Sequence, residues 1–242
     1  MLSSVLRDYE VKRKETELST GVLMFPEMEM FLARMRYRNR SEGTIRQYRS
    51  TLMDFLAYVH KPVAQITDDD VIGYLNAYER AREIKKRTKD GKRRIISSFF
   101  SYLLNNGYLP DGNPMCRVDP IEYTKTVRQA LTSREVEKMR IACGENVRDN
   151  VVLELFLATG CRVSEVAGLC LEDMDLREET AKIRGKGDKE RVVFLGARAI
   201  EFLERYLRGR KEGPVILSSR APHQGLKKNA LENIVRAIAQ RA

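Results

Sequence analysis

The 242-residue chain carries 44 Lys and Arg against 34 Asp and Glu, a formal net charge of +10, and 43% of its residues are apolar. This apolar content suffices for the core of one large domain or two ordinary ones, and the positive charge favours a polyanionic partner, most often nucleic acid. No apolar run approaches the roughly 20 residues of a membrane span, and residues 1–20 are too charged for a signal peptide. We therefore expect a cytoplasmic protein with no membrane partner.

The cysteines and histidines are not spaced as metal ligands. Structural zinc sites need C-x-x-C pairs or histidines at fixed spacing, and neither pattern occurs. We therefore expect no metal, no cofactor, and reduced, buried thiols. The residues concerned are Cys116, Cys143, Cys161, Cys170, His60 and His223.

The first half of the chain has helical periodicity. Residues 1–21 are polar and mixed in charge, and we expect an N-terminal arm there. Four amphipathic segments follow, and Thr67 with Asp70 is typical of a helix start. The sequence therefore predicts a small all-α domain over residues 22–112. The apolar stripes of the four helices begin at Met28, Ile45, Val71 and Ile95.

The densest positive charge, residues 80–94, precedes the apolar part of the fourth helix. Charge runs are usually solvated faces. This run leads into a packed helix, which favours phosphate contacts at its exposed start. We predict that Lys92 and Arg93 bind DNA, together with Arg46 and Arg49 of the second helix.

The second half begins after an aperiodic segment. Residues 113–130 contain two prolines and few apolar residues, which predicts an interdomain linker. Thr132 with Glu135 fits a capping box, and an apolar helix over 150–159 should end at Gly160.

The rest of this half alternates helices with a hairpin. Turn residues between two β-prone runs predict the hairpin. The second domain, 131–242, is thus predicted to be mainly α with a small antiparallel β-sheet. Its further elements are a short helix at 162–169, strands at 180–184 and 191–195, a helix at 197–210, an apolar segment at 215–217 and a helix from 227.

Two motifs stand close together in this domain. The sequence Thr-Gly-Cys-Arg-Val-Ser-Glu, 159–165, is followed about two dozen residues later by Gly-Lys-Gly-Asp-Lys-Glu-Arg, 185–191. The combination, within this order of elements, resembles the tyrosine recombinase or phage integrase family, including its Xer-like members, over residues 22–242. The resemblance implies a SAM-like helical core-binding domain and a catalytic domain that cleaves and rejoins DNA through a phosphotyrosine.

The resemblance also implies roles for individual residues. Arg162 would grip the scissile phosphate and stabilise the transition state, with Glu165 in support. Lys186 would be the general acid to the departing 5′ oxygen, and we assign Lys189 and Arg191 to DNA backbone contact. Taken singly, Arg162 and Glu165 could be a helix surface pair and Lys186 a solvated hairpin tip; the combination favours the functional interpretation.

One part of the family pattern is not found. The family's His-x-x-Arg box and tyrosine nucleophile are expected after the last predicted helix, and the sequence ends at Ala242. Neither His60 nor His223 lies in such a box, and neither Tyr123 nor Tyr206 follows one. We therefore expect a C-terminally incomplete catalytic domain that binds DNA without cleaving it.

Three explanations of this pattern stay open: a truncation, a natural fragment, or a non-catalytic relative. The first hypothesis is a site-specific recombinase or integrase subunit that binds duplex DNA with other protomers and has no small-molecule substrate. The alternative is a non-catalytic DNA-binding regulator that occupies recombination sites. Positive charge alone suggests a third, RNA binding, which salt-dependent affinities for DNA and RNA would distinguish.

Overall fold

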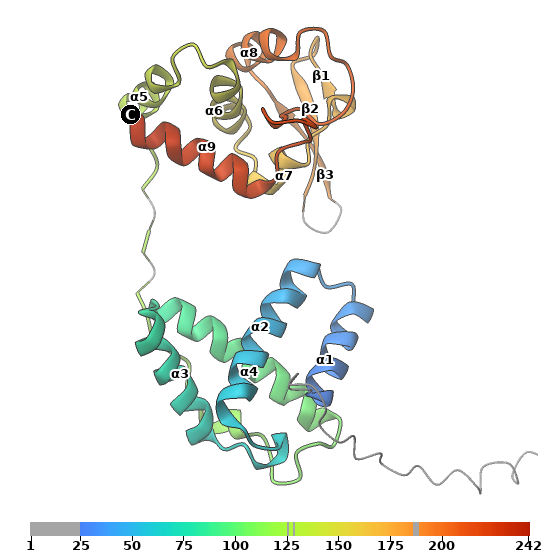
Figure 1. Cartoon of the computed structure of the whole chain (residues 1–242), viewed down its shortest axis with the longest axis vertical. Coiled ribbons are helices and arrows are strands. Elements are labelled where there is room, and N and C mark those ends of the chain that lie inside the picture. The colour runs from blue at the N-terminus through green and yellow to red at the C-terminus, as the bar shows by residue number, and fades with distance from the viewer. Residues whose placement is uncertain (1–24, 125, 128, 186–188) are drawn as a thin grey trace, which may run out of the picture. The chain divides into compact units, whose positions relative to one another are not determined.

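The computed structural model describes residues 25–124, 126–127, 129–185 and 189–242, and the chain divides into two compact units between Thr126 and Val127 (Figure 1). The expected N-terminal arm, 1–21, lies outside the described residues.

The first unit is a helical bundle, as predicted. A Thr67–Asp70 capping box begins α3, and the aromatic rings of Phe31 and Phe99 pack with centroids 5.6 Å apart in the core. The apolar stripes converge because each helix turns one face inward. The described helices are α1 (Pro26–Tyr37), α2 (Glu42–Val59), α3 (Asp68–Arg82) and α4 (Lys86–Asn105).

The core of the first unit extends into the predicted linker. Met115, in the 3-10 turn Pro114–Arg117, and Val118 are buried in that core. Farther along, the backbone N–H of Ile121 donates to Asp90 at 3.5 Å. This contact tethers the segment that leaves the first unit to α4.

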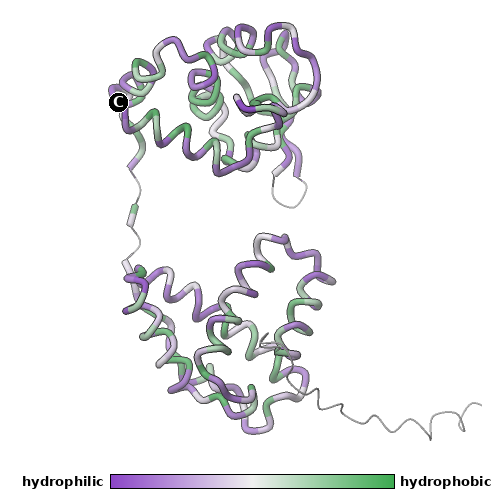
Figure 2. The backbone as a smooth tube through the Cα atoms, in the orientation of Figure 1, coloured by the Kyte–Doolittle hydropathy of each residue, from purple (hydrophilic) through white to green (hydrophobic). Residues whose placement is uncertain are grey.

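The second unit surrounds its most apolar helix. Val152 and Leu155 of α6 are buried with Leu203 of α8 and Leu231 of α9. Polar and apolar residues alternate along α9, as expected for a helix with one face inward (Figure 2). The helices are α5 (Ser133–Cys143), α6 (Val147–Thr159), α7 (Val163–Ala167), α8 (Ala197–Leu207) and α9 (Lys228–Arg241).

A three-stranded antiparallel sheet, β1-β2-β3, completes the second unit. Strands β2 (Thr180–Arg184) and β3 (Glu190–Phe194) form the predicted hairpin. Strand β1 (Met174–Asp175) was not predicted, because two residues are too short to show an alternating pattern. The apolar segment 215–217 forms no strand, but Leu217 makes an isolated bridge with Gly225.

The cysteine environments correct one expectation. Cys143 and Cys161 are buried, as predicted, but Cys116 is exposed and Cys170 is partly exposed. In the 3-10 turn that holds Cys116, the neighbouring Met115 points into the core instead. Across the described ranges, no helix is long and apolar enough to cross a membrane, and no three His, Cys, Asp or Glu side chains gather as metal ligands.

Candidate active site

The Thr-Gly-Cys-Arg motif forms a tight turn at the end of α6. Gly160 adopts φ +58°, a left-handed conformation that favours glycine, and so ends the helix. The Thr159 hydroxyl donates to the Leu155 carbonyl at 2.6 Å and accepts the Cys161 N–H at 3.2 Å. The turn is thereby fixed on both sides, and it presents Arg162 as the N-cap of α7.

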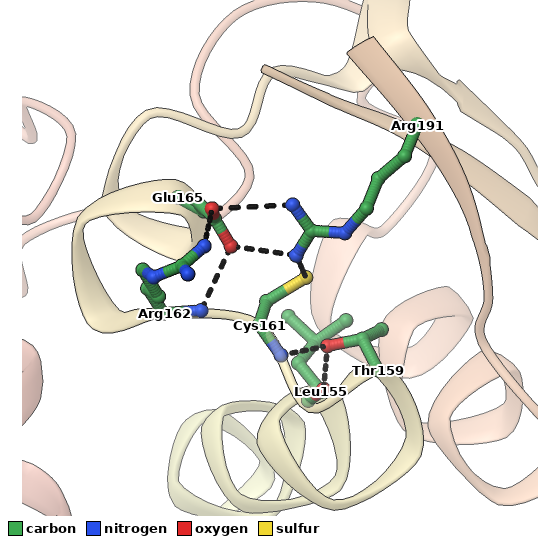
Figure 3. Close-up of polar contacts among 6 residues, drawn as sticks. All are labelled: Leu155, Thr159, Cys161, Arg162, Glu165 and Arg191. Carbon is green, nitrogen blue, oxygen red and sulfur yellow. Dashed lines mark hydrogen bonds and ion pairs between the residues drawn. The ribbon is translucent and has the colours of Figure 1, made fainter. Parts of the chain in front are cut away.

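The carboxylate of Glu165 is the centre of the site. Its side chain is 4% exposed, and it accepts four hydrogen bonds (Figure 3). Arg162 donates its backbone N–H to Oε2 and Nη1 to Oε1, both at 2.9 Å. Arg191 of β3 donates Nη2 to Oε2 at 2.8 Å and Nη1 to Oε1 at 3.2 Å. The two motifs therefore meet at one buried carboxylate.

The two arginines differ in exposure. The Arg162 side chain is 72% exposed, whereas that of Arg191 is 41% exposed. Among the described residues, Nη1 is the only side-chain donor of Arg162 that has a partner. Its remaining donors can therefore meet a ligand from solvent, and a guanidinium binds phosphate with two parallel N–H groups.

The base of the hairpin lies against this cluster. The Gly185 N–H donates to the Lys189 carbonyl at 2.8 Å. A Cβ on Gly185 would lie 3.5 Å from both Glu165 Oε1 and Arg191 Nη1. Lys186, the predicted general acid, follows Gly185 directly but lies outside the described residues.

Hydrogen bonds keep Glu165 ionised. Those from Arg191, followed by the one from the backbone N–H of Arg162, lower the pKa of Glu165 to about 2. An unfolded glutamate titrates at about 4.3. Because the folded pKa is the lower one, the stabilisation is fully present above the unfolded pKa and is lost as pH falls towards 2.

We therefore expect a pH-dependent effect of Glu165→Gln. The free energy of unfolding should fall by about 1–2 kcal/mol at pH 7, and the difference from wild type should vanish between pH 4.5 and pH 2. Denaturant unfolding at a series of pH values measures this difference, with the exposed Glu178→Gln as control. A difference between variant and wild type that is the same at pH 7 and pH 2 would contradict it.

The four predicted DNA-binding residues of the first unit differ in exposure and in their contacts. Arg46 is exposed. Arg49 forms a forked ion pair with Glu29, at 2.6 and 2.7 Å. Lys92 and Arg93 are only 12% and 14% exposed at their side chains.

Both of these less exposed cations have partners within the first unit. The ammonium of Lys92 lies 4.0 Å from the centre of the Tyr78 ring, and Arg93 Nε is 2.9 Å from Asp90. Lys92 falls on the same helical stripe as Ile96 and Phe99. That spacing was visible in the sequence and indicates a position facing the core.

Sequence reasoning did not single out the groove between α2 and α4. Gln47 and Ser50 of α2 line it together with Arg87 and Thr88 of α4. All four are exposed polar residues. Their common face becomes apparent only when the two helices are packed together.

Comparisons with known proteins identify the family. Residues 129–242 match the phage integrase family, and residues 28–108 match its N-terminal SAM-like domain. The tyrosine recombinase XerC of Oceanobacillus iheyensis is 32% identical over 227 residues, which is 85% of this chain and 72% of that protein. The chain belongs to the tyrosine recombinase family.

Other tyrosine recombinases match a smaller share. XerC of Thermodesulfovibrio yellowstonii is 34% identical over 171 residues, 69% of this chain and 56% of that protein. The chain thus spans little more than half the length of that relative. A crystal structure of a lambda integrase dimer bound to a COC′ core site has a TM-score of 0.73 at 18% identity, over 89% of this chain and 80% of that one. At this identity the likeness shows the fold alone.

Proposed function

We propose that this tyrosine recombinase is a subunit of a site-specific recombinase or integrase, in which Arg162 binds the phosphate at the cleavage position. The observation that carries the proposal is a 72% exposed arginine held by a 4% exposed carboxylate. Such a side chain is oriented before the ligand arrives, so it loses little conformational entropy when phosphate binds.

The chemistry follows from this arrangement. In strand cleavage through a phosphotyrosine, the tyrosine oxygen loses its proton to water and bonds to the scissile phosphorus, the P–O5′ bond breaks, and negative charge builds on the non-bridging oxygens. Arg162 stabilises that charge with parallel N–H donors. Lys186, carried on the hairpin whose base contacts Glu165, donates the proton that the departing 5′ oxygen needs.

The first unit supplies a second DNA contact in this proposal. Arg46 is the sequence-predicted cation best suited to direct contact, because it is exposed. Arg49, Lys92 and Arg93 would first have to give up partners within the unit. The exposed Arg87, which lines the groove between α2 and α4, is a further cation proposed to contact phosphate.

Residues 1–242 are further proposed to bind DNA without cleaving it. The Tyr206 hydroxyl accepts the Leu217 N–H at 3.0 Å, and the Tyr123 hydroxyl accepts Arg94 at 3.1 Å in the first unit. Both hydroxyls are thus engaged in structural contacts. Lambda integrase was solved as a dimer on its core site, which supports the proposal that protomers of this chain also meet on DNA.

The test begins with a duplex selected from a randomised library by the whole chain. We expect binding that weakens steeply with salt and is much tighter than binding to RNA of the same sequence. On a nicked suicide version of that duplex, we expect no covalent protein–DNA adduct on denaturing gels.

Two results would contradict parts of this account. Equal affinity for RNA and duplex DNA would remove the recombinase proposal. A covalent adduct would overturn the non-cleaving part alone, and mass spectrometry of that adduct would identify its nucleophile. The regulator alternative stays a prediction, which mixing this chain with an intact recombinase and following product yield would test.

A further inference from the structure

Two arginines contact Glu165, but they use their guanidinium groups differently. Arg191 donates from both terminal nitrogens, one to each carboxylate oxygen, at 3.2 and 2.8 Å. Toward the residues that the structure describes, Arg162 donates from Nη1 alone among its side-chain nitrogens (Figure 3). A forked pair occupies the guanidinium edge that would otherwise receive a phosphate. Arg191 has therefore committed that edge, while Arg162 has not.

The guanidinium of Arg191 also has two further neighbours, although its side chain is 41% exposed. Nη2 lies 3.6 Å from the buried Cys161 sulfur, in the turn just before Arg162. On the other side, a Cβ on Gly185 would lie 3.5 Å from Nη1. The guanidinium therefore lies between the turn that carries Arg162 and the base of the hairpin.

The charges of the three side chains also distinguish the roles of the two arginines. Glu165 contributes one negative charge and the two arginines contribute two positive ones, so the cluster is left with one net positive charge. Without Arg191, the carboxylate would neutralise Arg162, and an arriving phosphate would meet a site of no net charge. Arg191 thus orients Glu165 and also offsets its charge.

We propose that Arg191 is a positioning residue, which acts through Glu165 on Arg162 and does not itself bind DNA. It replaces the backbone-contact role that the sequence suggested for this residue. The inference rests on the proposed role of Arg162 as the phosphate ligand.

The test replaces single phosphates of the selected duplex with uncharged methylphosphonates and measures the affinity of the whole chain at each position. In the wild-type chain, the substitution at one phosphate position should lower the affinity by about 10- to 100-fold, as expected for lost hydrogen bonds to a charged group. Arg162→Ala should abolish that loss. Arg191→Gln, which removes the charge, should abolish it at the same position, and Arg191→Lys, which keeps the charge without the fork, should reduce it.

The double variant separates positioning from contact. If Arg191 acts through Arg162, Arg162→Ala combined with Arg191→Gln should bind no more weakly than Arg162→Ala alone. An Arg191 variant that loses sensitivity at a different phosphate, with effects that add to those of Arg162→Ala, would overturn the proposal. Arg177→Gln serves as control, because it removes the same charge from the exposed turn between β1 and β2.

A DNA-free measurement keeps the proposal testable apart from the proposed function. Carboxyl-carbon NMR of Glu165 should show its titration midpoint rising in Arg191→Lys and remaining unchanged in Arg177→Gln. An unchanged midpoint in Arg191→Lys would overturn the proposal whatever the DNA result. Conversely, a wild-type chain that tolerates every methylphosphonate, with the midpoint shifted as expected, would refute Arg162 as the phosphate ligand and leave only the Arg191–Glu165 contact. If Arg191→Gln unfolds the second unit, Arg191→Lys carries both comparisons.

Discussion

Arg162→Ala should weaken binding of the selected duplex by about 10- to 100-fold, since it removes hydrogen bonds to a charged phosphate. It should also reduce the slope of log affinity against log salt by about one, the value for one lost phosphate contact. Electrophoretic mobility shifts across a salt series measure both quantities.

The fold should survive this change. The hydrogen bond from the backbone N–H of residue 162 to Glu165 does not need the side chain, and Arg191 still pairs with the carboxylate. The matched control is Arg177→Ala, which removes the same charge from an exposed turn between β1 and β2. If both variants weaken binding equally, Arg162 contributes only general charge, and its role as phosphate ligand is wrong.

Glu154→Ala should destabilise the second unit by about 1.5–3 kcal/mol, because it removes a buried carboxylate that accepts hydrogen bonds from a charged arginine. The Glu154 side chain is 4% exposed in α6. Arg140 of α5 donates to it at 2.8 and 3.0 Å, and Arg198 of α8 lies 2.9 Å away. One carboxylate thus joins three helices. Native-state hydrogen exchange at the amides of Val152 and Leu155 measures the free energy of opening.

The chain offers a control that shares one partner. Glu137 contacts the same Arg140 at 3.4 Å, but its side chain is 56% exposed. Glu137→Ala should therefore change the free energy of unfolding by less than about 0.5 kcal/mol. If both variants lower the free energy of unfolding by a similarly small amount, the burial of Glu154 does not strengthen its ion pairs.

Local signals were the ones that the sequence could reveal. The Thr67–Asp70 and Thr132–Glu135 capping boxes and the left-handed Gly160 each depend on residues within one turn, and the structure contains all three. The hairpin could be predicted because its turn residues lie between two β-prone runs.

Contacts between distant elements could not be predicted in this way. The motif resemblance predicted that Arg162 and Glu165 act together. Nothing in the residue spacing indicated that Arg191, in β3, would pair with Glu165 in α7 through two hydrogen bonds. Likewise, the Glu154 cluster needs α5, α6 and α8 packed together before its charges meet. For Lys92, helical periodicity predicted a side chain that faces the core, whereas its charge predicted a solvent-exposed one. The structure agrees with the periodicity.

The central claim is that Arg162, held by Glu165, binds a DNA phosphate. A structure of the whole chain bound to its selected duplex tests this claim most directly. We predict the Arg162 guanidinium at hydrogen-bond distance, about 2.7–2.9 Å, from two oxygens of one phosphate, with Arg191 still on Glu165. A complex in which Arg162 contacts no phosphate, while the DNA lies against other surfaces of the second unit, would contradict the account.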